Sequence, residues 1–134
     1  MSYTLTTSLK QPIDEAIETL KNTLMTHKLG IVSEINVQAI IKNKLDEDIA
    51  PYRILGACNP GMAKKIIEAA PEAGALLPCT IVAREENIDG TAETIFHFMA
   101  PEPVLGLEDN AIVQEIATLA TKHITAAIAD LEKI

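Results

Sequence analysis

The stretch that decides the fold runs from residue 76 to residue 99 and reads LLPCTIVAREENIDGTAETIFHFM. Its first part, Leu76–Glu85, alternates between two faces that are both largely apolar, as in a strand that is covered on both sides. Residues 87–90 carry a turn signal, and Thr94–Met99 returns as a second strand. Together they predict an antiparallel hairpin with a loop longer than two residues.

Upstream of this hairpin, apolar spacing and capping residues predict three further strands and three helices. In chain order these are a strand at 3–8, a helix from Pro12 to Gly30, a strand at 31–36, a short helix at 37–45, a strand at 52–58 and a helix from Pro60 to about Ala70. Val37, Ile40 and Ile41 of the short helix are expected to face inward. Downstream, Pro101 and Pro103 indicate an extended loop, and residues 110–134 predict a long closing helix.

These elements predict the fold class α+β, with a mainly antiparallel sheet covered by helices. The helices are too unevenly spaced for a doubly wound parallel sheet, and the hairpin requires antiparallel pairing. A length of 134 residues suits one domain, and no linker or repeat divides it, so we expect a single domain over residues 1–134. A domain of this size folds without a metal or disulfide staple.

Composition narrows the classes of function. Nineteen acidic and eleven basic residues give a formal net charge of −8, which disfavours nonspecific binding to nucleic acid and to anionic membranes. No apolar stretch is long enough to cross a bilayer, and residues 1–9 lack a signal-peptide pattern, so the expected location is the cytoplasm. There the two cysteines are expected to be thiols.

The most distinctive local sequence is Tyr52-Arg53-Ile54-Leu55-Gly56-Ala57-Cys58-Asn59-Pro60. A strand that ends at Cys58 and a helix capped by Asn59 would turn the amides of Gly61 and Met62 back toward the strand end. Such a helix start attracts anions and stabilises a thiolate, and Arg53 could add a second positive group. The alternative is that Asn59 and Pro60 only cap a helix while Cys58 packs as a small apolar residue. Strand alternation also sends Arg53 and Cys58 to opposite faces.

Cys79 begins the strong strand and could meet Cys58 as a dithiol if the two strands are neighbours, although the spacing is far from Cys-x-x-Cys. The three histidines are scattered without a zinc-ligand spacing, and His97 and His123 are expected to pack rather than bind metal. No phosphate loop, dinucleotide fingerprint or nucleophile elbow occurs. We therefore predict no metal and no cofactor, and assign no catalytic residue.

The run from Tyr52 to Pro60, followed by Ala63 and by Leu76-Leu77-Pro78-Cys79, resembles the domain-of-unknown-function family 302 (DUF302) of bacteria and archaea. The resemblance extends over nearly the whole chain. It implies a compact α+β domain of the β-α-β-β-β-β-α type, similar to TATA-binding-protein-like folds and often dimeric. It implies no activity, and the likeness of fold is no reason to expect DNA binding.

Three hypotheses on function follow. The first is a small homodimeric binding domain whose cleft accepts a small anionic ligand or a protein partner. Its candidate ligand-binding residues are Tyr52, Arg53, Cys58, Asn59, Gly61, Met62 and Cys79. The second is a thiol-based redox enzyme or sensor that uses Cys58, Cys79 or both. The third assigns both motifs a structural role, with Gly56 for close packing, Asn59 and Pro60 for the helix start, and Pro78 to end a strand.

Overall fold

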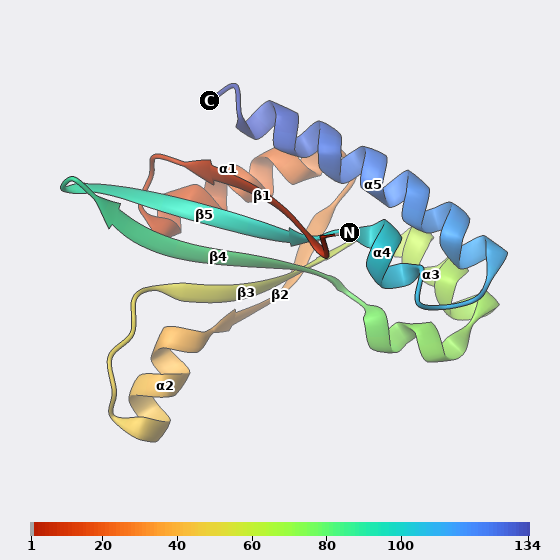
Figure 1. Ribbon diagram of the computed structural model, residues 1–134, viewed down its shortest axis with the longest axis horizontal. Coiled ribbons are helices and arrows are strands. Elements are labelled where there is room, and N and C mark those ends of the chain that lie inside the picture. Colours follow the sequence, from red (N-terminus) through yellow and green to blue (C-terminus); the bar gives the residue numbers. More distant parts are fainter. Residues whose placement is uncertain (1) are drawn as a thin grey trace.

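The computed structural model describes residues 2–134 and contains one five-stranded sheet with its long helices on one side (Figure 1). The elements, in order, are β1 (Thr4–Leu9), α1 (Ile13–Thr26), β2 (Gly30–Asn36), α2 (Val37–Leu45), β3 (Tyr52–Cys58), α3 (Pro60–Ala69), the 3₁₀ helix η1 (Pro71–Leu76), β4 (Cys79–Ile88), β5 (Thr91–Met99), α4 (Pro101–Leu105) and α5 (Ala111–Leu131). The strand order is β1-β5-β4-β3-β2, and every neighbouring pair is antiparallel. The predicted α+β class is confirmed.

The main core lies between the sheet and the helices α1 and α5. Strand register places Leu55, Ile81 and Phe98 side by side across β3, β4 and β5, and all three are buried. The apolar stripe of α1 packs against this face, and Ile124 and Leu131 of α5 complete the layer. Burial of one continuous apolar face by two amphipathic helices provides most of the stability of such a domain.

A second hydrophobic cluster lies beyond one end of the sheet. It joins α3, η1, α4 and the first half of α5, with Ile66, Leu105 and Val113 at its centre. Leu76 at the end of η1, Leu77 just after it and Met99 at the end of β5 pack against this cluster. Because α5 contributes to both clusters, it links this end of the molecule to the main core. Among residues 2–134, no helix combines the length and the apolarity needed to cross a bilayer.

The predicted cap forms at the start of α3, and α5 starts with a cap of the same kind, whereas α1 begins at Ile13, one residue after the predicted Pro12. The side chain of Asn59 accepts a hydrogen bond from Met62 N at the start of α3, and that of Asn110 accepts from Val113 N at the start of α5. The end of α1 differs from the expectation: the helix stops at Thr26, and Gly30 is the first residue of β2. The chain leaves the helix through Lys28, which has a φ of 62°.

The hairpin connection is shorter than expected. Ile88 pairs with Thr91, so Asp89 and Gly90 alone form the turn, with φ values of 52° and 82°. Positive φ at both central residues is the geometry of a type I′ turn, for which Asp-Gly is a favoured sequence. The prediction of a longer loop was wrong because the strands extend past the core, where both faces are polar and apolar alternation disappears.

Three other expectations also fail. Leu76 closes η1 instead of beginning β4, because Leu76 and Leu77 pack into the second cluster. Pro101 begins the short helix α4 instead of an extended loop, since proline is tolerated in the first turn of a helix. The short helix α2 does not pack inward: none of its residues is buried, because it stands away from the sheet on the side opposite α1 and α5 (Figure 1).

Candidate functional site

The junction between β3 and α3 is built by Asn59. Its side chain accepts from Met62 N at 3.1 Å and donates through Nδ2 to the carbonyl of Lys28 at 3.0 Å, while its backbone carbonyl accepts from Ala63 N at 2.9 Å. One residue thus caps α3 and ties it to the loop before β2. Because Met62 and Ala63 already have partners and Pro60 has no N–H, the first turn of α3 has few amides left for an anion.

Gly56 allows the chain to pass closely over β3. A Cβ at this position would overlap Ser33 Oγ and would lie 2.6 Å from Pro78 Cγ. Any side chain would therefore push the segment Leu77–Cys79 away from β3. This segment forms one wall of the candidate site, so Gly56 sets the position of that wall. Its close-packing role is the one that the structural hypothesis assigned to it.

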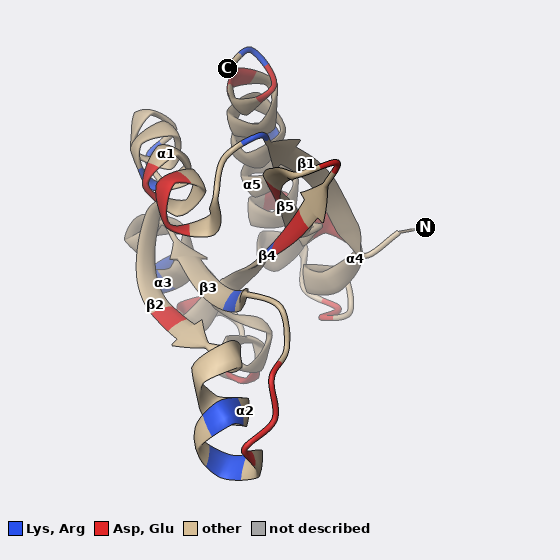
Figure 2. Cartoon of the chain, turned by 90° about the vertical axis from the view of Figure 1, so that its left-hand side faces the viewer, with Lys and Arg blue, Asp and Glu red and all other residues tan. Residues whose placement is uncertain are grey.

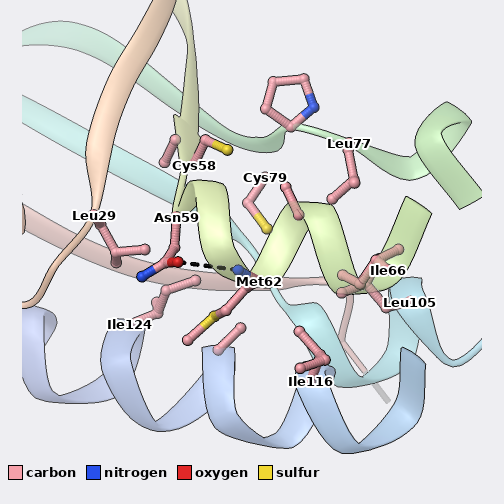
Figure 3. A pocket seen from close by; sticks show the side chains of 14 residues that line it. Leu29, Cys58, Asn59, Met62, Ile66, Leu77, Cys79, Leu105, Ile116 and Ile124 are labelled. Carbon is pink, nitrogen blue, oxygen red and sulfur yellow. Dashed lines mark hydrogen bonds between the residues drawn. The ribbon is translucent and has the colours of Figure 1, made fainter. Parts of the chain in front are cut away.

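A narrow apolar pocket lies between the main core and the second cluster, at the point where β3 ends and β4 begins (Figure 3). It holds about 40 Å³ of free space. Cofactors and drug-sized ligands occupy several hundred Å³, so this pocket matches a much smaller group. The lining comes from strands, helices and loops that are distant in sequence: Leu29, Ala57, Cys58, Asn59, Met62, Ala63, Ile66, Leu77, Pro78, Cys79, Leu105, Ile116, Ala120 and Ile124.

Both cysteines line this pocket as free, half-buried thiols. Cys79 is the register partner of Ala57, and Cys58 is the next residue of the adjoining strand, with its side chain on the opposite face from that of Ala57. The sulfur of Cys79 points toward α3, whereas that of Cys58 is turned in a different direction (Figure 3). Burial raises the pKa of Cys58, and burial together with the nearby Cys58 raises the pKa of Cys79 to about 11. At neutral pH both groups are therefore protonated and weakly nucleophilic.

The structure separates the predicted site residues into two groups. Cys58, Asn59, Met62 and Cys79 line the pocket, and Gly61 lies exposed in the adjoining first turn of α3 without being part of the lining.

The remaining two, Tyr52 and Arg53, begin β3 at its opposite end. Five residues of extended strand place Arg53 about 16 Å from Cys58. There the Arg53 guanidinium contacts Asp14 at 2.8 Å and Glu34 at 3.2 Å. Arg53 therefore joins β3 to α1 and β2 and adds no charge to the pocket.

Several pocket residues were not predicted as site residues. Leu29 follows α1, Leu105 belongs to α4, and Ile116 and Ile124 come from α5. The apolar stripe of the last helix includes Ile116 and Ile124, but its spacing identifies only core positions. No local signal shows that these residues meet Cys58 and Cys79.

The histidines lie apart from the pocket. His27 Nε2 lies 2.6 Å from Asp130 Oδ2, which joins the end of α1 to α5. On β5, His97 bonds through Nδ1 to Thr6 and accepts from Arg84 at Nε2, and burial lowers its pKa, as does the charge of Arg84. His123 is half-buried on α5. Within residues 2–134, no three metal-ligating side chains come together.

Fold and site together define a small α+β domain with an apolar, thiol-bearing pocket at the end of an antiparallel sheet. The chain belongs to the family described as domain of unknown function DUF302, which it matches over residues 4–131. It is similar to the crystal structure of the uncharacterized conserved protein DUF302 from Bacillus stearothermophilus, with a TM-score of 0.82 and 24% identity over 96% of this chain and 98% of that one. That similarity confirms the fold. No curated protein matches the chain.

Proposed function

We propose that this domain binds ligands by receiving one small aliphatic group in the pocket beside Cys58, Met62 and Cys79. The observation that carries the proposal is the chemistry of the lining, in which Asn59 contributes an amide and the other side chains are aliphatic groups, thiols and a thioether. Such a surface gains free energy by excluding water from an apolar group. About 40 Å³ of space is little more than one water molecule occupies in the liquid, so the pocket suits a small alkyl end group, whether it belongs to a small molecule or to a protein side chain.

The side chain of Met62 lies on the α3 side of the pocket and allows it to adapt (Figure 3). Methionine is unbranched and polarizable, so it can change rotamer around groups of slightly different shape. Anion binding has less support, because Asn59 already accepts from the Met62 amide and Arg53 lies at the far end of β3. Thiolate chemistry has less support as well, since burial raises the pKa of both cysteines.

The proposal can be tested with three probes followed by amide chemical shifts. Propanol carries the apolar tail alone, propionate adds a charge to the same tail, and phosphate carries charge alone. We expect propanol and propionate to shift the amides of Met62, Ala63 and Cys79. Burying three carbon atoms corresponds to a Kd on the order of 20 mM. Shifts at Gly61 and Met62 with phosphate, together with none for propanol, would favour an anion site and contradict this proposal.

A matched pair of variants locates the binding. Ala63 and Ala69 are half-buried residues of α3, but only Ala63 lines the pocket. The larger side chain of Ala63→Leu should occupy the free space and abolish the propanol-induced shifts at Cys79. Ala69→Leu should leave them unchanged. Equal responses of the two variants would place propanol elsewhere on the protein.

A further inference from the structure

The surface where α3 meets α5 carries a groove that is wider than the pocket. It holds about 390 Å³ of free space, which lies in the range of small-molecule sites. One residue of α3 and five residues from two turns of α5 line it: Lys65, Glu115, Ile116, Thr118, Leu119 and Lys122. Ile116 lines the pocket beside the cysteines as well, and the other five belong to the groove alone. The groove is therefore a second place where a ligand could lie.

The helices α3 and α5 run antiparallel along this groove. At one end, Asn110 Nδ2, in the cap of α5, donates to the carbonyl of Ala69, the last residue of α3, at 3.4 Å. Toward the other end, Met62 in the first turn of α3 and Ile124 in the second half of α5 line the same pocket. Positions along the two helices can therefore be compared on one axis.

This arrangement places Lys65 and Lys122 within reach of a common point. Lys65 precedes Ala69 by four residues, and Lys122 follows Asn110 by twelve. With a rise of about 1.5 Å per residue, the Cα atoms of the two lysines differ by about 12 Å along the shared axis. A lysine stem spans about 6 Å, so both ammonium groups can approach the level of Leu119 from opposite ends of the groove. One anion beside Leu119 could then contact both.

The charges that line the groove are not used by the fold. Among residues 2–134, neither Lys65 nor Lys122 forms an ion pair, whereas the neighbouring Lys64 pairs with Glu68 at 3.0 Å. Glu115 also lines the groove, and it stands too far from both lysines to pair with them. Two cations and one carboxylate leave one net positive charge. That balance matches a singly charged carboxylate better than a doubly charged phosphate.

The net charge of the whole chain does not prevent an anion from binding here. Acidic residues outnumber basic ones and give a formal charge of −8, but both kinds are spread over many elements (Figure 2). At an ionic strength of about 0.1 M, salt screens charges that lie more than about 10 Å apart. An anion in the groove therefore responds mainly to Lys65, Lys122 and Glu115.

Between these charges the groove is apolar. Leu119 is exposed, and Ile116 beside it is buried. An alkyl chain laid along them would remove the side chain of Leu119 from water. We propose that the groove between α3 and α5 binds a free aliphatic carboxylic acid, with its carboxylate between Lys65 and Lys122 and its alkyl chain along Leu119. This site does not depend on the function proposed for the pocket.

Three probes with the same six-carbon chain test which charge the groove selects. Hexanoate is anionic, hexanol is neutral and hexylammonium is cationic. In amide chemical-shift titrations, hexanoate should shift Thr118, Leu119 and Lys122 with a Kd on the order of 5 mM, from half-burial of the chain and two screened charge contacts. Hexanol should bind about tenfold more weakly, and about 1 M salt should remove most of that difference. A Kd for hexylammonium that equals that of hexanoate would overturn the proposal.

Matched variants of the charged residues locate the carboxylate. The double variant Lys65→Gln with Lys122→Gln should raise the Kd for hexanoate about tenfold and leave the Kd for hexanol unchanged. The control Lys64→Gln changes an exposed lysine of the same helix that does not line the groove, and it should have no effect. Glu115→Gln removes the opposing carboxylate and should lower the Kd about threefold. Equal effects of the double variant and of Lys64→Gln would contradict the proposal.

A second matched pair tests the apolar contact. Leu119 and Ile112 are aliphatic residues of α5 that are 43% and 50% exposed, but only Leu119 lines the groove. Leu119→Ala should raise the Kd for hexanoate about fivefold, and Ile112→Ala should leave it unchanged. Ala63→Leu, which fills the pocket, should leave the hexanoate-induced shifts at Thr118 intact. Loss of these shifts in Ala63→Leu would show that hexanoate binds in the pocket and not in the groove.

Discussion

Replacing Gly56 by alanine tests the close approach that positions the pocket wall. The added Cβ would overlap Ser33 Oγ and lie 2.6 Å from Pro78 Cγ. Ser33 is exposed and its hydroxyl can rotate away, but the proline ring can move only with its backbone. Overpacking of this kind costs about 1 to 3 kcal/mol of the free energy of unfolding. For a domain of this size, thermal unfolding should shift down by about 4 to 10 °C.

The matched control is Gly74→Ala, since a Cβ at Gly74 would meet no atom within 4 Å and its φ is not positive. That substitution should leave the melting temperature unchanged or raise it slightly, by restricting the unfolded chain. Differential scanning calorimetry of both variants measures the difference directly. The combination Gly56→Ala with Ser33→Ala should recover only part of the loss, because the contact with Pro78 remains. A Gly56→Ala melting temperature equal to that of the wild type would refute the argument.

Three other outcomes follow from the site. The folded-state pKa of Cys79 is raised from 9.0 to about 11, so the free energy of unfolding should fall by about 2 kcal/mol as the pH rises between these two values. Urea titration at each pH measures this fall, and Cys79→Ala should remove it. Asn59→Ala removes both side-chain hydrogen bonds, to Met62 N and to Lys28 O, and should cost about 1 to 2 kcal/mol in the same assay. Arg53→Ala should lower the free energy of unfolding by about 1 kcal/mol and leave the propanol-induced shifts at the pocket intact. Loss of those shifts would show that Arg53 contributes to the pocket.

Local chemistry explains why so much of the element pattern was predictable. The start of α3 depends on Asn59, which accepts a hydrogen bond from an amide three residues away, and on Pro60, whose fixed φ suits the first helical position. Likewise, the side chains of β3 alternate between two faces of the sheet because successive residues of an extended strand point in opposite directions. The predictions were wrong where an element depends on contacts with residues far away in the sequence. The second cluster holds Leu76 and Leu77 out of the strand, and α2 lacks the inward packing that its apolar residues indicated.

By itself, the sequence determined the α+β class, the antiparallel hairpin and the junction of Cys58, Asn59 and Pro60, because periodicity and capping act over a few neighbouring residues. Only the tertiary structure decided whether the surroundings of that junction are apolar or positively charged. It brought Leu105 and Ile116 against the two cysteines and left Arg53 at the other end of β3. A helix start that could have held an anion thereby became the edge of an apolar pocket. Thiol pKa depends on how much water surrounds the sulfur, and that quantity is set by residues up to about a hundred positions apart in the chain.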